Sequence, residues 1–229
     1  MVLFYIGAGL VLAGCPRPLP PLIPQPLAPG DRGSAVAWAA ATVPAHRTDV
    51  KFRWKYQDDQ KRWGGRGRAR IAPPDSLRFD YVGPLGLGAG AAALVGDSAI
   101  WADPEKNFRS LVPAVRMLWA GLGIVRPPAA GAAVSSATDA GPAERTMWRF
   151  VEGADTLDYV ATEGNSRVLQ VQWRQAGRVH AQCTTRLEVH GLPADARIDF
   201  QEDHARFELT VVALDTSATF DAAIWRGRR

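Results

Sequence analysis

Val50-Lys51-Phe52-Arg53-Trp54-Lys55-Tyr56 alternates strictly between apolar and cationic side chains. This period of two is typical of a β-strand that turns one face to a core and the other to water. Arginines alternate in the same way over 66–71, and aromatic residues do so over 76–82. The three segments therefore predict neighbouring antiparallel strands with a solvated basic face and an apolar inner face.

The rest of the chain predicts a large sheet interrupted by two helices. One helix runs through 35–41, after a cap at Asp31 or Ser34, and the other follows the apolar stripe from Phe108 to Leu122. The Ala-, Gly-, Ser- and Pro-rich segment 126–145 is expected to be a mobile loop. We expect about 11 strands, at 50–56, 66–71, 76–82, 88–95, 98–102, 146–151, 155–162, 166–174, 177–189, 196–201 and 205–213, with 218–225 as a further candidate.

A sheet of this size tends to curl. The expected fold class is therefore α+β, a half-open antiparallel β-barrel with helices covering its concave face. The chain has 229 residues, of which 47% are hydrophobic and 22% charged, which is enough for one domain with a sizeable core. Two cysteines exclude a disulfide scaffold and a four-cysteine zinc site. The net charge of +4 does not by itself call for nucleic acid.

The N-terminal residues resemble a lipoprotein signal. An apolar run ends at Gly14, which is too short to cross a bilayer, and Leu12-Ala13-Gly14-Cys15 resembles the bacterial lipobox. There the signal peptide is cut before the cysteine, whose thiol then carries acyl chains such as palmitate. The alternatives are an ordinary signal peptide and a buried helix that ends in cysteine. We expect a signal peptide at 1–14, a lipidated Cys15 with a proline-rich spacer at 15–30, and a domain at 31–229.

Several stretches between 64 and 128 resemble the LolA/LolB superfamily of lipoprotein carriers and receptors. They are Gly67-Arg68-Ala69-Arg70, 74–81, Gly83-Pro84-Leu85-Gly86, 95–101 and Trp119-Ala120-Gly121-Leu122-Gly123. The resemblance implies a cavity for the acyl chains of lipoproteins and a membrane-insertion loop at Pro84, Leu85 and Gly86. It also implies a periplasmic carrier protein as partner. Pro16, where an Asp would signal inner-membrane retention, implies the periplasmic face of the outer membrane.

An acyl cavity needs apolar walls without unpaired charge, and it needs free volume on the concave side of the sheet. If the concave side has no free volume, the carrier hypothesis is excluded, and the protein is expected to be membrane-tethered with another role. Simple core packing is the alternative for each residue of the expected wall. The residues expected to line the cavity are Phe52, Trp54, Phe79, Tyr81, Trp101, Leu118, Trp119 and Leu122.

The basic side of the first strands is a second candidate surface. It suits anionic lipid headgroups or an acidic partner, and a merely solvated face is the alternative. Exposed aromatic residues for stacking on RNA are not evident there, so no nucleic acid is expected. The residues expected on this basic face are Lys51, Arg53, Lys55, Arg66, Arg68 and Arg70.

Signatures of enzymes are thin. Cys183 and His180 point to opposite faces of one predicted strand, which disfavours a catalytic or metal-binding pair. No nucleophile elbow, zinc-protease motif or phosphate-binding loop occurs in the sequence. We therefore expect a monomeric, non-catalytic protein without cofactor or metal, which binds acyl chains and aids lipid or lipoprotein localisation. A scaffold lipoprotein acting through its basic face is the alternative.

Overall fold

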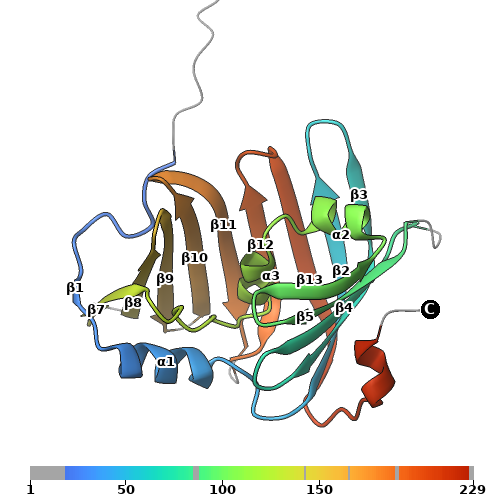
Figure 1. Cartoon of the computed structure of the whole chain (residues 1–229), viewed down its shortest axis with the longest axis horizontal. Helices are drawn as coiled ribbons and strands as arrows, with labels where there is room; N and C mark the ends of the chain where they lie inside the picture. The colour runs from blue at the N-terminus through green and yellow to red at the C-terminus, as the bar shows by residue number, and fades with distance from the viewer. Residues whose placement is uncertain (1–18, 85–87, 142, 165, 189–190, 227–229) are drawn as a thin grey trace, which may run out of the picture.

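The structure is a computed structural model that describes residues 19–84, 88–141, 143–164, 166–188 and 191–226. Its centre is one open antiparallel sheet in the order β1-β7-β8-β9-β10-β11-β12-β13-β2-β3-β4-β5-β6 (Figure 1). The strands are β1 (Ala28–Pro29), β2 (Thr48–Gln57), β3 (Arg62–Ala72), β4 (Ser76–Val82), β5 (Gly90–Val95), β6 (Ser98–Asp103), β7 (Ala133–Asp139), β8 (Glu144–Glu152), β9 (Asp155–Glu163), β10 (Arg167–Gln175), β11 (Arg178–Leu187), β12 (Pro193–Phe200) and β13 (Ala205–Asp215).

The protein is mostly β, not α+β as expected. The sheet has 13 strands where about 11 were predicted, and it is not closed. Helical structure in the described part of the chain is limited to short segments. They are α1 (Arg32–Ala41), α2 (Glu105–Leu111), α3 (Val115–Gly121) and the 3₁₀ turn η2 (Ala222–Trp225).

Three local predictions were wrong. The expected loop at 126–145 contains β7, which pairs with β1 and β8. The expected single helix from Phe108 is divided into α2 and α3, because Pro113 between them has no N–H to continue the hydrogen-bond ladder. The candidate strand at 218–225 holds the turn η2 instead.

Helices α1 and α3 lie against the concave face of the sheet. Ser34 N donates to Asp31 Oδ2 at 2.6 Å and so caps α1 as predicted. From α1, Trp38 stacks on Trp148 of β8 at 5.9 Å and meets the Tyr159 ring at 6.0 Å. The contact joins the helix to the main hydrophobic core on the inner side of the sheet.

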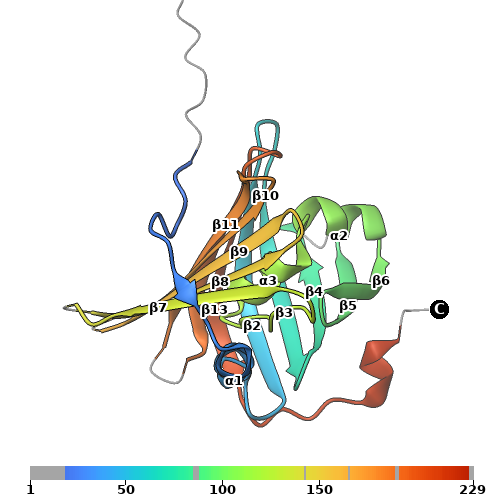
Figure 2. The same cartoon turned by 60° about the vertical axis from the view of Figure 1, so that its left-hand side comes forward.

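The N-terminal segment lies on the opposite, convex face. Ile23 is 1% exposed and packs with Met147 and Val160 in a small separate core. The buried Gln172 side chain donates to the Pro20 carbonyl at 3.1 Å and accepts from Leu22 N at 3.0 Å. The described part of the proline-rich segment is therefore attached to the domain, and it reaches β1 at the edge of the sheet (Figure 2).

A charged network supports this attachment. Asp158 of β9 is fully buried and accepts from Arg149 at 2.6 Å and from Arg174 at 2.9 Å. Arg149 also donates to the Ile23 carbonyl at 2.8 Å. Because a buried carboxylate is costly without partners, Asp158 keeps both arginines at this site, and Arg149 thereby helps to hold the segment in place.

Candidate functional site

The concave face carries an aromatic cluster from β2 and β4. Phe52 and Phe79 stack with ring centroids 5.4 Å apart, and Trp54 meets Tyr81 edge-on at 6.2 Å. All four side chains are buried. Four of the residues predicted to line an acyl cavity thus lie on one face and in contact with one another.

Glycines of the neighbouring strands provide the space for these rings. A Cβ atom at Gly67 of β3 would lie 2.2 Å from the Phe52 ring. A Cβ atom at Gly90 of β5 would lie 2.3 Å from the Tyr81 hydroxyl oxygen. The rings therefore lean across positions that only glycine leaves open.

Helix α3 brings three further predicted residues to the same side. Leu118, Trp119 and Leu122 are all buried in the main core. Trp119 Nε1 donates to the Gly96 carbonyl at 2.8 Å, and Thr185 of β11 donates to the Ala120 carbonyl at 2.7 Å. The seven predicted lining residues on this side therefore pack against each other and α3 in this structure.

Trp101 is the predicted lining residue that lies elsewhere. A β-bulge between β5 and β6 places it opposite Ala93, on the convex side of the sheet. Its Nε1 donates to the Trp225 carbonyl at 2.8 Å, and the Arg78 guanidinium lies 5.1 Å from its ring. The expectation that Trp101 faces the same space as Phe79 is corrected by this shift in register.

Buried polar atoms on the concave face are few. The Tyr81 hydroxyl has no hydrogen-bond partner among the residues described, and burial raises the pKa of Tyr81 to about 12. Trp148 Nε1 is likewise buried without a partner. The inner face is therefore suited to apolar groups and offers little to an ionic one.

A pocket opens beside this aromatic cluster, between β6 and the two short helices. Its volume is about 480 Å³, which is within the usual range for ligand sites. Phe108 of α2 borders it and also approaches Phe79 of the cluster at 6.3 Å. Its walls are Ser98, Ala99, Ile100, Trp101, Ala102, Phe108, Val112, Pro113 and Val115, with Asp97, Glu105 and Arg109 as charged members.

The lipidation and insertion sites are only partly visible. Cys15, Leu85 and Gly86 lie outside the described residues, as does the predicted signal peptide. Pro84 is described and exposed at the end of β4. Among the described residues, no helix has the length and hydropathy that a membrane crossing would need.

The basic residues lie on the convex face, as alternation predicts. Lys51, Arg53 and Lys55 of β2 are exposed, and so is Arg66 of β3. Arg53 stands directly opposite Arg66 in the β2–β3 register, and Lys51 stands opposite Arg68. The structure therefore brings the predicted basic residues of the two strands together on one surface.

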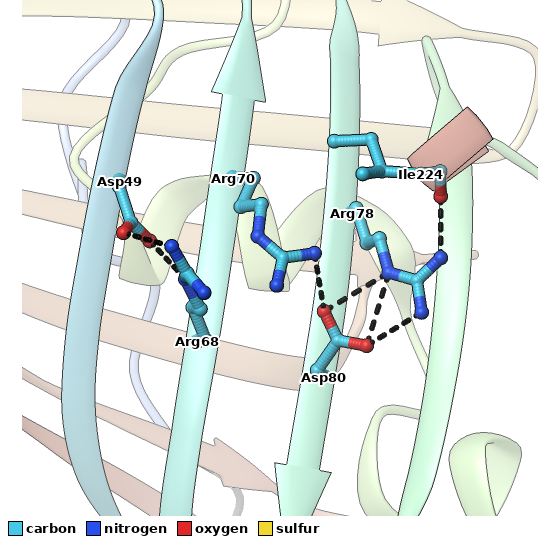
Figure 3. A network of polar contacts seen from close by, with 6 residues as sticks. All are labelled: Asp49, Arg68, Arg70, Arg78, Asp80 and Ile224. Atoms are coloured by element: carbon cyan, nitrogen blue, oxygen red, sulfur yellow. Dashed lines mark hydrogen bonds and ion pairs between the residues drawn. The ribbon is translucent and has the colours of Figure 1, made fainter. Parts of the chain in front are cut away.

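Two of these cations are compensated inside the fold (Figure 3). Arg68 forms a bidentate pair with Asp49 at 2.6 and 2.7 Å, and this hydrogen bonding raises the pKa of Arg68. Arg70 approaches Asp80 at 3.3 Å, and Arg78 binds Asp80 at 2.8 Å. Burial is the main influence on Arg70 and lowers its pKa.

A groove of about 440 Å³ lies among the remaining cations of this face. It crosses β13, β2, β3 and β4 on the convex side. No carboxylate forms an ion pair with Lys51, Arg53 or Arg66 within the described residues. The groove is bordered by Lys51, Phe52, Arg53, Arg66, Gly67, Arg68, Asp80, Val82 and Val212.

Cys183 and His180 do not form a catalytic pair. Cys183 is buried, and burial raises the pKa of its thiol to about 12. Its sulfur lies 3.4 Å from the Thr185 hydroxyl, whereas His180 Nδ1 lies 3.1 Å from Glu202. No group of metal-ligating side chains is found in the described part of the chain.

Comparison with known proteins identifies the fold. A LolA superfamily protein from Nitrosomonas europaea superposes with a TM-score of 0.59 over 86% of this chain and 98% of its own, at 9% sequence identity. The chain has the LolA fold. A domain from Vibrio parahaemolyticus, described as outer membrane lipoprotein-sorting, aligns with a TM-score of 0.54 over 84% of this chain and 94% of its own, at 9% identity.

No family model matches the sequence, and no curated protein matches it. The predicted resemblance to the LolA/LolB superfamily is thus confirmed as a likeness of structure, at a sequence identity too low to transfer residues or activity.

Proposed function

We propose that this protein is a non-catalytic, lipid-anchored envelope protein that binds an acyl chain and aids lipid or lipoprotein localisation to the outer membrane. One observation carries the proposal. The pocket between β6 and α2–α3 is bordered by apolar side chains such as Ile100, Val112 and Val115 together with charged ones, and Phe108 links it to the aromatic cluster on the concave face. An acyl chain entering there would pass a largely polar surface and then meet aromatic rings.

Displacement of α2 would lengthen this site. Phe108 is buried, whereas Glu105, Lys106, Asn107 and Arg109 of the same helix are exposed. Pro104 at the N-cap makes no side-chain cap hydrogen bond. Among the described side chains of α2, Phe108 is the buried one, so its replacement by part of an acyl chain would exchange one apolar contact for another.

The energetic gain is sufficient for binding. Each buried methylene contributes roughly 0.8 kcal/mol, so a chain of about 10 buried carbons gains on the order of 8 kcal/mol before ordering costs. Helix α3 is held more firmly than α2, through the Trp119 and Thr185 hydrogen bonds. We therefore expect α3 to remain in place as one wall while α2 moves.

The alternative of a scaffold that acts through its whole basic face has less support. Asp49 forms an ion pair with Arg68, and Asp80 forms ion pairs with Arg70 and Arg78. This face therefore presents a smaller free charge than the sequence indicates. A charge-reversed variant with Arg53→Glu and Lys55→Glu that still captures the same protein partners would exclude this alternative.

The acyl proposal is tested by filling the pocket. Ala99 is exposed at its wall, so Ala99→Trp occupies the mouth without entering the core. We expect this variant to lose uptake of a fluorescent fatty acid and to lose lipid that copurifies in native mass spectrometry. The matched control is Ala194→Trp, which fills a separate pocket bordered by β12 and β13. Equal fatty-acid uptake by the two variants, or no uptake by the unmodified protein, would reject the proposal.

A further inference from the structure

The groove on the convex face combines three cations that form no ion pair within the described residues, although Lys51 interacts at longer range with Asp215. Arg53 and Arg66 face each other across β2 and β3, and Lys51 lies on the same side of β2. Like charges directly opposite on neighbouring strands are destabilising. Arg68 and Asp80 also border the groove, but each is held in an ion pair of its own. The groove therefore retains an uncompensated positive charge that an anion would relieve.

Apolar side chains stand on both sides of these cations. Val82 of β4 is 42% exposed, and Val212 of β13 is 56% exposed. They border the groove from opposite sides, because β13 and β4 flank the β2–β3 pair in the sheet. The groove thus offers a cationic centre next to apolar contacts, which complements an anionic amphiphile.

We propose that this groove binds the phosphate-bearing headgroup of an anionic phospholipid. The phosphate lies between Arg53 and Arg66, whose guanidinium groups match phosphate oxygens in pairs, with Lys51 as an additional point charge. The glycerol and first acyl carbons lie against Val82 and Val212. This site lies on the face opposite the acyl pocket and goes beyond the function proposed above.

An acidic peptide segment fits the groove less well. Peptides commonly bind to sheets by adding a strand to a free edge. The four strands of the groove lie inside the sheet, and each is already paired on both sides. The groove volume of about 440 Å³ is instead typical of small-molecule sites. Charge and shape together favour a single lipid headgroup.

The test is calorimetric titration with short-chain phosphatidylglycerol below its critical micelle concentration. We expect saturable binding that weakens with salt, because the contacts are ionic and exposed. Phosphatidylcholine with the same chains is expected to bind more weakly, since its choline places a positive charge beside Arg53 and Arg66. Inorganic phosphate lacks the apolar contacts with Val82 and Val212, and it is also expected to bind more weakly.

The variant Arg53→Gln/Arg66→Gln removes the charged pair, and loss of its charged hydrogen bonds is expected to reduce the affinity about tenfold or more. Lys55→Gln is the matched control, on the same strand and face but outside the groove. Thermal melting checks that both variants fold. Ala99→Trp is expected to leave this binding intact, so failure of the acyl proposal and failure of this one are distinguishable.

Three outcomes overturn the inference. Unchanged affinity in the double variant places the lipid elsewhere. Inorganic phosphate that binds as tightly as phosphatidylglycerol makes the groove a site for free phosphate. Binding of hexaglutamate without binding of phosphatidylglycerol assigns the groove to an acidic protein segment.

Discussion

Gly67 gives the Phe52 ring its place above β3. A methyl group there would come within 2.2 Å of ring atoms that are fully packed against Phe79. We predict that Gly67→Ala lowers the free energy of unfolding by about 1–3 kcal/mol, the usual cost of overpacking a core. Urea denaturation measures the change.

Gly131 supplies the control for this substitution. A Cβ atom there would meet no atom within 4 Å. Gly131→Ala is therefore expected to unfold at nearly the same urea concentration as the unmodified protein. Equal midpoints for the Gly67 and Gly131 variants would mean that the Phe52 ring can move aside without cost.

The sequence was informative about which side chains share a face, and less so about their partners. Alternation placed Lys51, Arg53 and Arg66 correctly on one side, because a strand turns successive side chains to opposite faces. It missed Asp49 and Asp80, which become neighbours of the arginines only through strand register. These two partners could have been predicted only from the pairing of the strands.

The N-terminal segment is held to β10 by one side chain with two hydrogen bonds. Gln172 is fully buried and contacts the backbone of Pro20 and of Leu22. We predict that Gln172→Ala releases residues 19–27 from the convex face, because two backbone groups lose their partner at once. Hydrogen exchange of this segment should become faster, and the free energy of unfolding should fall by about 1–3 kcal/mol.

Gln170→Ala provides the comparison for the attached segment. Gln170 is on the same face of the same strand, but it makes no hydrogen bond to the N-terminal segment within the described structure. Its replacement is expected to leave exchange at 19–27 unchanged. If both variants exchange at the rate of the unmodified protein, then β1, Ile23 and the Arg149 contact suffice to hold the segment.

Strands were predicted well wherever large apolar side chains alternate with polar ones. The strand β7 was missed because Ala133-Val134-Ser135-Ser136-Ala137 is small and weakly apolar, a composition that is also typical of loops. It forms a strand because β8 on one side and β1 on the other satisfy its backbone. The break between α2 and α3 follows from Pro113, which lies inside the single helix expected from Phe108 to Leu122.

If Cys15 carries a lipid anchor, the sheet topology indicates which end of the molecule faces the membrane. Leu19 and Gln57, at the end of β2, border the same pocket of about 620 Å³. Val82 at the end of β4 pairs with Arg66, so the segment that follows it leaves the sheet toward this same end. An anchor at Cys15 would therefore bring the predicted insertion loop close to the bilayer.

We predict that Leu85→Glu impairs transfer of a bound fluorescent fatty acid to vesicles but leaves its uptake unchanged, because a charge at the loop tip opposes entry into a membrane. Val95→Glu is the control, since Val95 is exposed at the other end of the sheet. Stopped-flow fluorescence measures the transfer rate. Equal transfer rates for the two variants would show that the loop is only a turn.

Attachment of the proline-rich segment to the domain shortens the free linker between Cys15 and the domain. Between Cys15 and Pro20, whose carbonyl is bound by Gln172, the chain can span about 17 Å at most. If Cys15 carries the proposed lipid anchor, a protein tethered so closely could not leave the bilayer to collect a lipid. Under the proposed function it would then receive its lipid from a soluble carrier.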